Sequence, residues 1–345
     1  MEKFIEYSAD IDDDLLLLLH CEKTSKGLFS KDFNLDTFGQ DECSSLFRFA
    51  KDDLHHLSSE LHIPEKFVAS NGTAVSGIEA LCVMLKRLSY PNRLQELRDF
   101  YQRPVSEISY ISNSLTDFLY DNYGHLLSEL DRSWLSEDNL HEFANAIFNA
   151  GSPLTNCWGF IDGTVRPICR PFVNQREVFN GHKRVHSLKF QSIVTPNGLI
   201  ANMFGPVEGR RHDAGMLRET GLLDTLRQKM TMADGTIYSL YGDPAYPIHP
   251  HLIGPFRGHR LSNEEQVFNT KMSSVRVSVE LLFNKIVRNF AFVDFCKNQK
   301  LCLQPVGKYY VVAAMLSNCH TCLYGNQVAE MFELQPPNLR EYLHG

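Results

Sequence analysis

The sequence has no hydrophobic run long enough to span a membrane. A bilayer crossing needs about 18 consecutive apolar residues, whereas the longest leucine run, at residues 15–19, is short and follows a cluster of aspartates. The N-terminus also lacks the basic segment of a secretory signal peptide, so we expect neither secretion nor a membrane span.

The pattern of a disulfide framework is missing as well. The nine cysteines are an odd number and are spread thinly over 345 residues, unlike the dense, even-numbered cysteines of small secreted domains. We therefore expect an intracellular, reducing compartment. The length allows two domains.

Several catalytic and nucleotide-binding motifs are absent. The sequence contains no GxxxxGK[ST] and no GxGxxG, which argues against ATP or a dinucleotide as ligand. It also contains no GxSxG, so acyl transfer by a serine nucleophile is not indicated.

The chain lacks the basic balance that is typical of nucleic-acid-binding domains, because its formal net charge is −7. The acidic excess is local. Residues 1–60 carry 14 acidic and 6 basic side chains, and the remaining 285 residues carry a net charge of +1. Within that remainder, residues 163–240 have 11 basic against 6 acidic side chains, and residues 256–300 have 8 against 4. These two basic stretches are therefore compatible with an anionic partner such as nucleic acid.

The first 150 residues are predicted to be an all-α region. Apolar residues recur at helical spacing over 76–90, and further helices are expected over 94–101 and from 105 to about 119. Two helices joined by a short turn suggest a helix-turn-helix within about 76–125. The residues that would face a DNA groove are Ser106, Glu107, Ser109 and Tyr110. A plain three-helix bundle that reads no DNA is an equally good interpretation.

After residue 151 the pattern changes to short strands and helices. Strands are expected at 157–161, 188–194, 199–204 and 237–241, with a hairpin turn at 195–198 and a helix over 213–229. A later helix carries one continuous apolar face from Val279 to Phe290. The sequence therefore predicts an α/β fold with a mixed sheet flanked by helices, preceded by the helical region, with a boundary near residue 150.

Three acidic residues stand out in this second part. Asp162 follows the first strand and precedes Gly163, which would let the backbone turn, and Asp243 follows another strand in the segment GDPAY. Ligands of open α/β sheets bind at the carboxyl ends of strands. Glu280 lies at the edge of the apolar face of the later helix, from where it can reach those strand ends.

Three converging carboxylates point to divalent cations. Carboxylates repel one another unless a hard cation with oxygen ligands compensates their charge. Two such ions about 4 Å apart can promote attack on a phosphodiester and stabilise its leaving oxygen. Asp162, Asp243 and Glu280 are therefore the candidate catalytic and metal-binding residues.

The order of these segments resembles a known family. The sequences IDGTVRPICRP, FNGHKRVHSLKFQSIVTPNGLIANMFGPVEGRRHDAGMLRETGLL, LYGDPAYP and FNTKMSSVRVSVELLF are similar to the DDE endonuclease domain of PIF/Harbinger-type transposases and of the nuclease derived from them. The resemblance covers about 155–325 and leaves 326–345 as a C-terminal tail. It implies an RNase H-like fold, a DDE triad at Asp162, Asp243 and Glu280, and Mg²⁺ or Mn²⁺ as cofactor.

The same resemblance highlights the segment GRRHDAGM. His212 and Asp213 could be accessory site residues near the metals or the DNA backbone; alternatively, Asp213 caps the following helix and His212 packs beside it. The candidate phosphate contacts are Arg176, Lys183, Arg184, Arg210 and Arg211. Exposed basic side chains are often only solvated, so this surface is an expectation from local charge.

Zinc is a weaker interpretation. His182 and His186 have i, i+4 spacing, but their surroundings predict a loop that enters a strand. Cys319 and Cys322 form a single CxxC without a second pair, which is more typical of a buried helix end than of a zinc site.

The leading hypothesis is thus a nuclear, divalent-metal-dependent DNA endonuclease or transposase, with the cytoplasm as a further location. The alternative is a transposase-derived protein that binds DNA or a protein and does not cut. A hydrolase of small phosphoesters is disfavoured by the basic stretches. The resemblance also implies a separate Myb-like DNA-binding partner protein, while homo-oligomerisation and the DNA target stay open.

Overall fold

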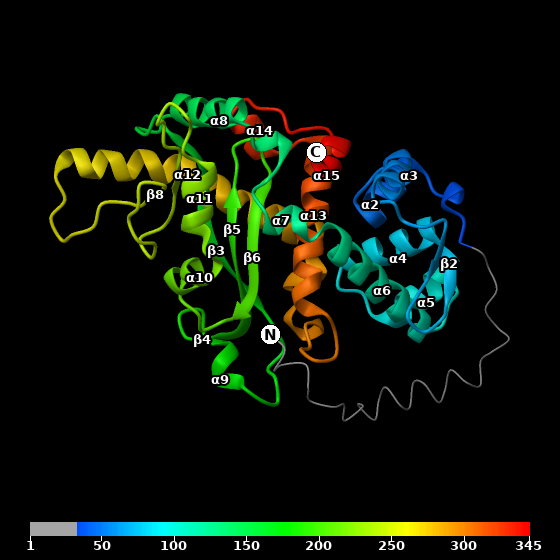
Figure 1. Cartoon of the computed structure of the whole chain (residues 1–345). Coiled ribbons are helices and arrows are strands. Elements are labelled where there is room, and N and C mark those ends of the chain that lie inside the picture. The colour runs from blue at the N-terminus through cyan, green and yellow to red at the C-terminus, as the bar shows by residue number, and fades with distance from the viewer. Residues whose placement is uncertain (1–32) are drawn as a thin grey trace.

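The computed structural model describes residues 33–345 (Figure 1). The helices are α2 (Gln40–Phe47), α3 (Lys51–Glu60), α4 (Gly77–Ser89), α5 (Leu94–Tyr101), α6 (Val105–Tyr123), α7 (His125–Ser128), α8 (Glu137–Asn149), α9 (Gln175–Val178), α10 (Asp213–Thr220), α11 (Leu222–Lys229), α12 (Asn263–Asn289), α13 (Val306–Tyr324), α14 (Gln327–Met331) and α15 (Leu339–His344). The strands are β1 (Lys66–Val68), β2 (Ala74–Ser76), β3 (Cys157–Pro167), β4 (Phe179–Asn180), β5 (Val185–Val194), β6 (Ile200–Glu208), β7 (Ser239–Tyr241) and β8 (Leu252–Ile253). Short 3₁₀ helices lie at Leu35–Thr37, Ser133–Leu135, Ala291–Asp294 and Cys296–Asn298.

The N-terminal part is helical, as predicted, over the residues that the structure describes; the first 32 residues of that prediction lie outside them. Helix α4 is its centre, because its residues are almost all buried and it packs against α6. The Ser76 hydroxyl caps α4 by accepting a hydrogen bond from the Glu79 amide, at 3.2 Å. The small antiparallel hairpin of β1 and β2 was not predicted.

The second part is built on one mixed sheet. Strand β3 lies at its centre, antiparallel to β5 and parallel to β7, while β6 pairs with β5 and β8 pairs with β7 in parallel. The short β4 extends the sheet beside the start of β5. This is the predicted α/β arrangement of an RNase H-like domain, with helices packed against a mixed sheet.

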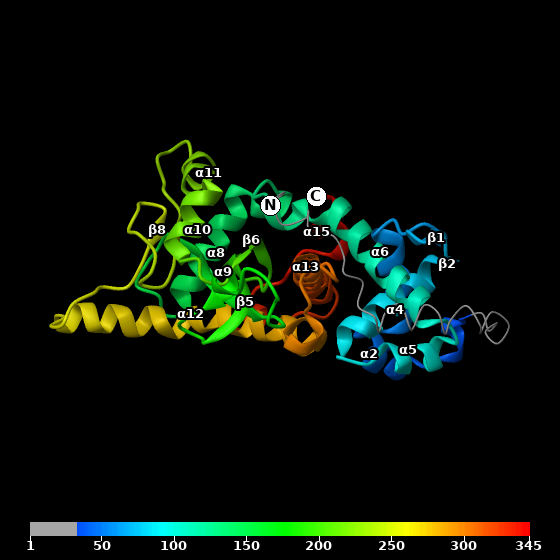
Figure 2. The ribbon, with the colours of Figure 1, turned by 90° about the horizontal axis from the view of Figure 1, so that it is seen from below.

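Helices from both parts of the chain cover the sheet. Helix α12 packs against β3 and β5, and α10 and α11 lie on the side of the sheet away from α12 (Figure 2). Helices α7 and α8 precede the predicted boundary near residue 150, yet they pack against β6 and β3. Helix α13 contacts both α6 and β6 and lies between the sheet and the N-terminal helices (Figure 1). Helices before residue 150 therefore pack directly against the sheet that follows it, so the predicted boundary does not separate two packing units.

Three local expectations differ from the structure. Strand β3 does not end at residue 161 but continues to Pro167, so Asp162 lies within a strand. The helix expected over 213–229 is two helices, because Gly221 has a left-handed φ of 61° and breaks it. Residues 326–345 form α14 and α15, whose apolar side chains Val328, Leu339, Tyr342 and Leu343 are buried. The segment is a packed end of the molecule.

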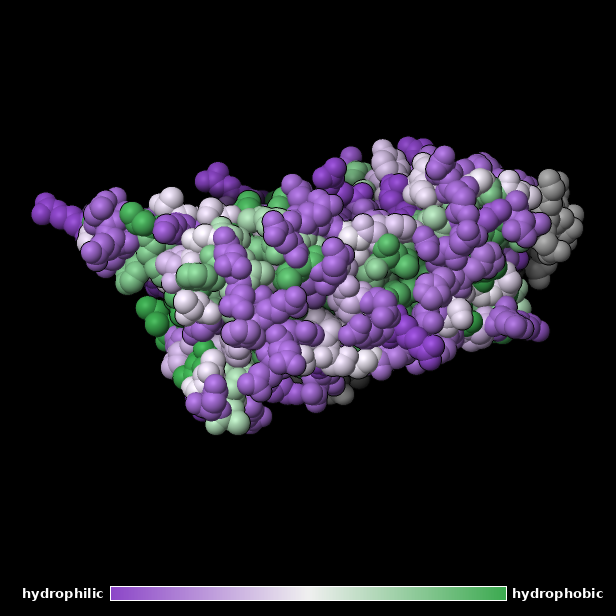
Figure 3. Space-filling model, turned by 90° about the horizontal axis from the view of Figure 1, so that it is seen from above, coloured by the Kyte–Doolittle hydropathy of each residue, from purple (hydrophilic) through white to green (hydrophobic). Residues whose placement is uncertain are grey.

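The surface carries hydrophobic side chains in separated patches. Hydrophilic residues cover most of the face drawn in Figure 3, and the hydrophobic ones gather in small groups between them. Among residues 33–345, no helix combines the length and the apolar character that a bilayer crossing requires.

Candidate functional site

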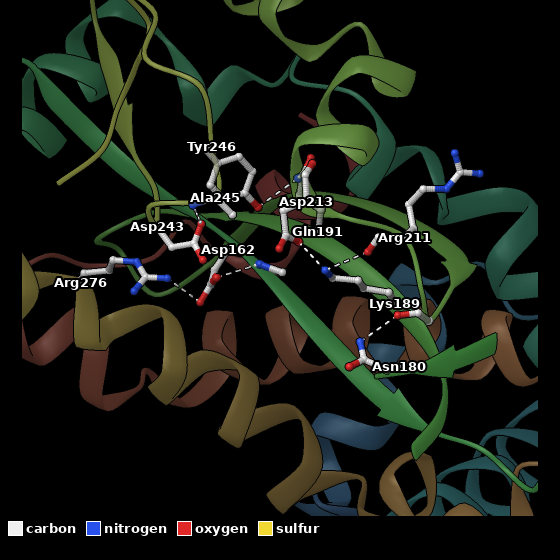
Figure 4. Close-up of polar contacts among 12 residues, drawn as sticks. Asp162, Asn180, Lys189, Gln191, Arg211, Asp213, Asp243, Ala245, Tyr246 and Arg276 are labelled. Carbon is white, nitrogen blue, oxygen red and sulfur yellow. Dashed lines mark hydrogen bonds and ion pairs between the residues drawn. The ribbon is translucent and has the colours of Figure 1, made fainter. Parts of the chain in front are cut away.

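The sheet register places Asp162 beside Asp243. Phe160 of β3 is paired with Tyr241 of the parallel strand β7. Asp162 comes two residues after Phe160, and Asp243 comes two residues after Tyr241. Side chains two residues apart point to the same face of a sheet, so the two carboxylates meet at adjacent positions (Figure 4). Backbone amides orient both: the Gly163 amide donates to Asp162 Oδ1 and the Ala245 amide donates to Asp243 Oδ1, each at 2.9 Å.

Burial dominates the electrostatics of Asp162. It raises the pKa of the Asp162 carboxyl to about 6, and the neighbouring charges of Asp243 and Asp213 act in the same direction. The Arg276 guanidinium opposes this rise. Arg276 reaches from α12 and places its Nη2 2.8 Å from Asp162 Oδ2 (Figure 4).

Glu280 lies on α12, one helical turn beyond Arg276, and its side chain is exposed. Residues four apart share a helix face. Glu280 therefore lies on the face of α12 that also bears Arg276, the residue that contacts Asp162. The three candidate residues therefore come from β3, the segment after β7, and α12. In this structure Arg276, and not Glu280, contacts Asp162.

Asp213 lies close enough to Asp162 to act on its charge, and it is not the cap residue of its helix. His212 is the N-terminal cap residue of α10, with no capping hydrogen bond from its side chain, and Asp213 is the first helical residue. The Asp213 carboxylate pairs with Lys189 of β5 at 2.8 Å. A Cβ atom at Gly163 would lie only 2.3 Å from Asp213 Oδ1, so the glycine is required by this close approach and not by a turn.

Three site neighbours were not predicted. Lys189 and Gln191 stand two residues apart on β5 and form a polar stripe in a strand that is otherwise buried and mostly apolar. Gln191 Nε2 donates to the Tyr246 hydroxyl at 3.0 Å, which fixes the segment that follows Asp243. The signal was available: polar residues at a spacing of two in an apolar strand point to one face.

The candidate phosphate-contacting residues divide into two groups. Arg210 pairs with Glu177, and Arg211 pairs with Glu208 at 3.3 Å and with Glu219 at 3.4 Å. Arg176, Lys183 and Arg184 are exposed and have no ion pair within residues 33–345. They lie in α9 and in the connection between β4 and β5, and Phe172, four residues before Arg176, is fully exposed.

The predicted helix-turn-helix corresponds to α4, α5 and α6, with bounds close to those expected. Its turn is internally neutralised, because Arg103 pairs with the buried Glu79 at 2.5 Å and with Glu107 at 3.2 Å. Tyr110 is 43% exposed on α6. DNA reading by these helices stays a prediction.

The other histidine and cysteine candidates lie apart from the carboxylates. His182 lies in the connection between β4 and β5, and His186 lies in β5, as expected from the sequence. Cys319 is buried, and Cys322 is partly buried, in the last turns of α13.

A divalent cation fits this site in part. Asp162 and Asp243 supply adjacent carboxylate oxygens, the donor type that Mg²⁺ and Mn²⁺ prefer. Burial raises the pKa of the Asp162 carboxyl even with Arg276 beside it, so the charged form of Asp162 gains from a further cation nearby. Over residues 33–345, however, no three acidic, histidine or cysteine side chains converge closely enough to hold a metal. Glu280 would have to turn inward to complete the set.

Residues 161–318 match a family model described as DDE superfamily endonuclease. The matched segment contains Asp162, Asp243 and Glu280 and falls within the predicted domain of 155–325. This segment is therefore similar to the DDE superfamily endonucleases. A protein of Arabidopsis thaliana called "Protein ALP1-like" is 24% identical over 241 residues. That alignment covers 67% of this chain and spans 57% of the relative's length. No solved structure matches the chain significantly.

Proposed function

We propose that this protein is a divalent-metal-dependent DNA endonuclease of the PIF/Harbinger type, acting as a nuclease or a transposase. The observation that carries the proposal is the adjacent, backbone-oriented pair Asp162 and Asp243 in a segment that matches DDE superfamily endonucleases. Two partly buried carboxylates side by side are a costly arrangement, and cation binding gives it a purpose.

In this proposal Asp162, Asp243 and Glu280 hold Mg²⁺ or Mn²⁺. A divalent cation bound there supplies Lewis-acid chemistry, making water a better nucleophile and offsetting the charge that develops on the phosphodiester. Asp162 in β3 and Asp243 just after β7 would supply carboxylate oxygens, with their orientation set by backbone amides. Glu280 completes the set from α12, while His212 is an accessory residue at the start of α10 and Asp213 supports the site through Lys189.

The DNA backbone would lie over Arg176, Lys183 and Arg184, whose charges no carboxylate of residues 33–345 neutralises. The exposed Phe172, four residues before Arg176, offers an aromatic face of the kind on which unpaired bases stack. Arg210 and Arg211 contribute less, because each already pairs with glutamate.

The test is nicking of supercoiled plasmid by the full chain with Mg²⁺ or Mn²⁺ and with EDTA. We expect cation-dependent nicking and a decrease of at least about tenfold in Asp162→Asn and in Asp243→Asn, because loss of even an outer-shell partner of a metal ligand costs about 10–100-fold. Asp224→Asn is the control, because Asp224 is exposed on α11 and pairs only with Arg227 among the described residues. Undiminished nicking by a folded Asp243→Asn protein would refute the mechanism.

A second candidate function is a transposase-derived protein that binds DNA or a protein without cutting. Arg276 favours it, because its guanidinium lies on the carboxylate that the metal needs and Glu280 is turned to solvent. In the same assay this candidate predicts no nicking with either cation while DNA binding persists.

The place of action and the partners are proposals of the same kind. We propose a nuclear protein that works with a separate Myb-like DNA-binding protein. The acidic N-terminal stretch and the neutralised α5–α6 turn give the chain little basic surface of its own for tight DNA binding. Such a partner would then raise the affinity for DNA.

A further inference from the structure

The contact between Arg276 and Asp162 is unusual in its placement. The two side chains are only 23% and 18% exposed, and they join α12 to the centre of the sheet at 2.8 Å. The Nε atom of Arg276 is buried and has no hydrogen-bond partner among the described residues. The guanidinium therefore uses few of its five donors here, so its position is poorly explained by a purely structural role.

The carboxylates around it explain the position better. Asp162 lies beside Asp243, and Asp213 adds a third negative charge nearby. Lys189 already pairs with Asp213, so Arg276 is the cation that compensates the Asp162–Asp243 pair. Asp162 Oδ1 already accepts a hydrogen bond from the Gly163 amide, so a divalent cation at these carboxylates would compete with Arg276 for Oδ2.

We propose that Arg276 is a resident counter-ion that competes with the divalent cation for Asp162 and is released when the cation binds. This inference rests on the proposed function, because it concerns the same carboxylates, but it is a statement about binding and not about cleavage. The long arginine side chain can leave without moving α12. Its guanidinium then stays one helical turn from Glu280, where it can contact an anionic phosphate by two parallel hydrogen bonds.

The competing explanation is a structural clamp that merely holds α12 on β3. The two explanations predict opposite signs for cation affinity. Removing a clamp loosens the site and weakens cation binding, whereas removing a competitor frees Asp162 and strengthens it. Affinity for Mn²⁺ therefore distinguishes them, and no cleavage needs to be observed.

The experiment is titration of the full chain with Mn²⁺, followed by electron paramagnetic resonance of the free ion. We expect Arg276→Gln to bind Mn²⁺ on the order of tenfold more tightly than the wild type, because the cation no longer displaces a paired charge. Arg276→Lys keeps the charge and should stay near the wild type. Arg288→Gln is the matched control, since Arg288 is exposed on the same helix, and it should leave the affinity unchanged.

A second variant and a second measurement keep the inference testable if Arg276→Gln does not fold. Arg276→Met retains the apolar stem if the glutamine variant does not fold, and Mn²⁺ should raise its melting temperature more than that of the wild type. Unchanged or weaker Mn²⁺ binding by a folded Arg276 variant would overturn the inference. Tighter binding by the variant in a chain that never nicks DNA would support the inference while the proposed function fails.

Discussion

Gly163 shows how closely the residues around Asp162 are packed. It lies in the middle of β3, where a glycine normally weakens a strand, yet a Cβ atom there would meet the Asp213 carboxylate and the Lys189 side chain. The absence of a side chain allows Asp213 and Lys189 to pair directly against the strand. At the residue scale, the pairing of Asp213 with Lys189 depends on the missing side chain at residue 163.

Replacing Gly163 with alanine should therefore destabilise the protein. The added methyl group would lie 2.3 Å from Asp213 Oδ1, and overpacking of this kind costs about 1–3 kcal/mol. Urea unfolding of the variant measures the loss. Gly181→Ala is the control, because nothing lies within 4 Å of its Cβ position; an equal loss in both variants would show that the Asp213 contact is not the cause.

The sequence singled out the two aspartates that the structure brings together, but not the side chains that contact them. Asp162 and Asp243 were found because each follows a recognisable apolar strand and stands next to a glycine. The pairing of Asp162 with Arg276 and of Asp213 with Lys189 depends on how α12 and α10 pack on the sheet. No local pattern encodes such long-range contacts.

At the scale of elements, the sequence predicted well those helices and turns whose ends are marked by local residues. Helices α4 and α5 and the turn at 195–198 agree with the sequence prediction, because caps, prolines and glycines mark their ends. The strand at 157–161 was predicted too short, since Gly163 was interpreted as a turn residue. The C-terminal helices were missed because helices of five and six residues give too short a periodic signal.

The connection between β4 and β5 is the element for which we predict DNA contact. Replacing Lys183 with glutamine and Arg184 with asparagine removes two exposed charges, and asparagine tolerates the left-handed φ of 57° at residue 184. We expect weaker binding to duplex DNA and a salt dependence shallower by about 0.9 per lost phosphate contact. Fluorescence anisotropy at several salt concentrations measures both.

The matched control removes two positive charges at the other candidate phosphate contacts. Arg210→Gln combined with Arg211→Gln changes the net charge equally, but both arginines are paired with glutamates. We expect a smaller loss of affinity from this pair. If both double variants lose affinity equally, net charge, and not this connection, governs DNA binding.

At the scale of the whole molecule, α13 joins the N-terminal helices to the sheet. On one side the Tyr324 hydroxyl donates to Asp53 and accepts a hydrogen bond from the Ala50 amide, and the His320 ring packs on Phe49 with centroids 5.6 Å apart. On the other side Asn318 bonds the backbone of Ile200 at the start of β6. The two parts of the chain therefore share one core.

His320 makes this junction sensitive to acid. Burial lowers the pKa of the His320 imidazole to about 4, and the positive charges of Lys285 and Arg48 act in the same direction. The unfolded chain binds the proton more readily, so this contribution to stability is complete above about pH 6.5 and is lost as the pH falls toward 4. His320→Phe keeps the ring contacts and removes the titration.

Urea unfolding at pH 7 and pH 5 tests this prediction. We expect the wild type to lose about 1–2 kcal/mol more than His320→Phe over that interval. His259→Phe is the control, because His259 is exposed in the segment before α12, and it should lose as much as the wild type. A loss in His320→Phe equal to that of the wild type would place the acid sensitivity elsewhere.

The parallel register of β3 and β7 has a consequence for how the chain can change in length. One residue inserted between Cys157 and Asp162 would turn the aspartate to the opposite face of the sheet and away from Asp243. The segments 168–174 and 254–262 lie outside this ladder and could lengthen without moving either carboxylate. Insertions and deletions among natural variants of this chain should therefore gather in those two segments and spare the residues between Cys157 and Asp162.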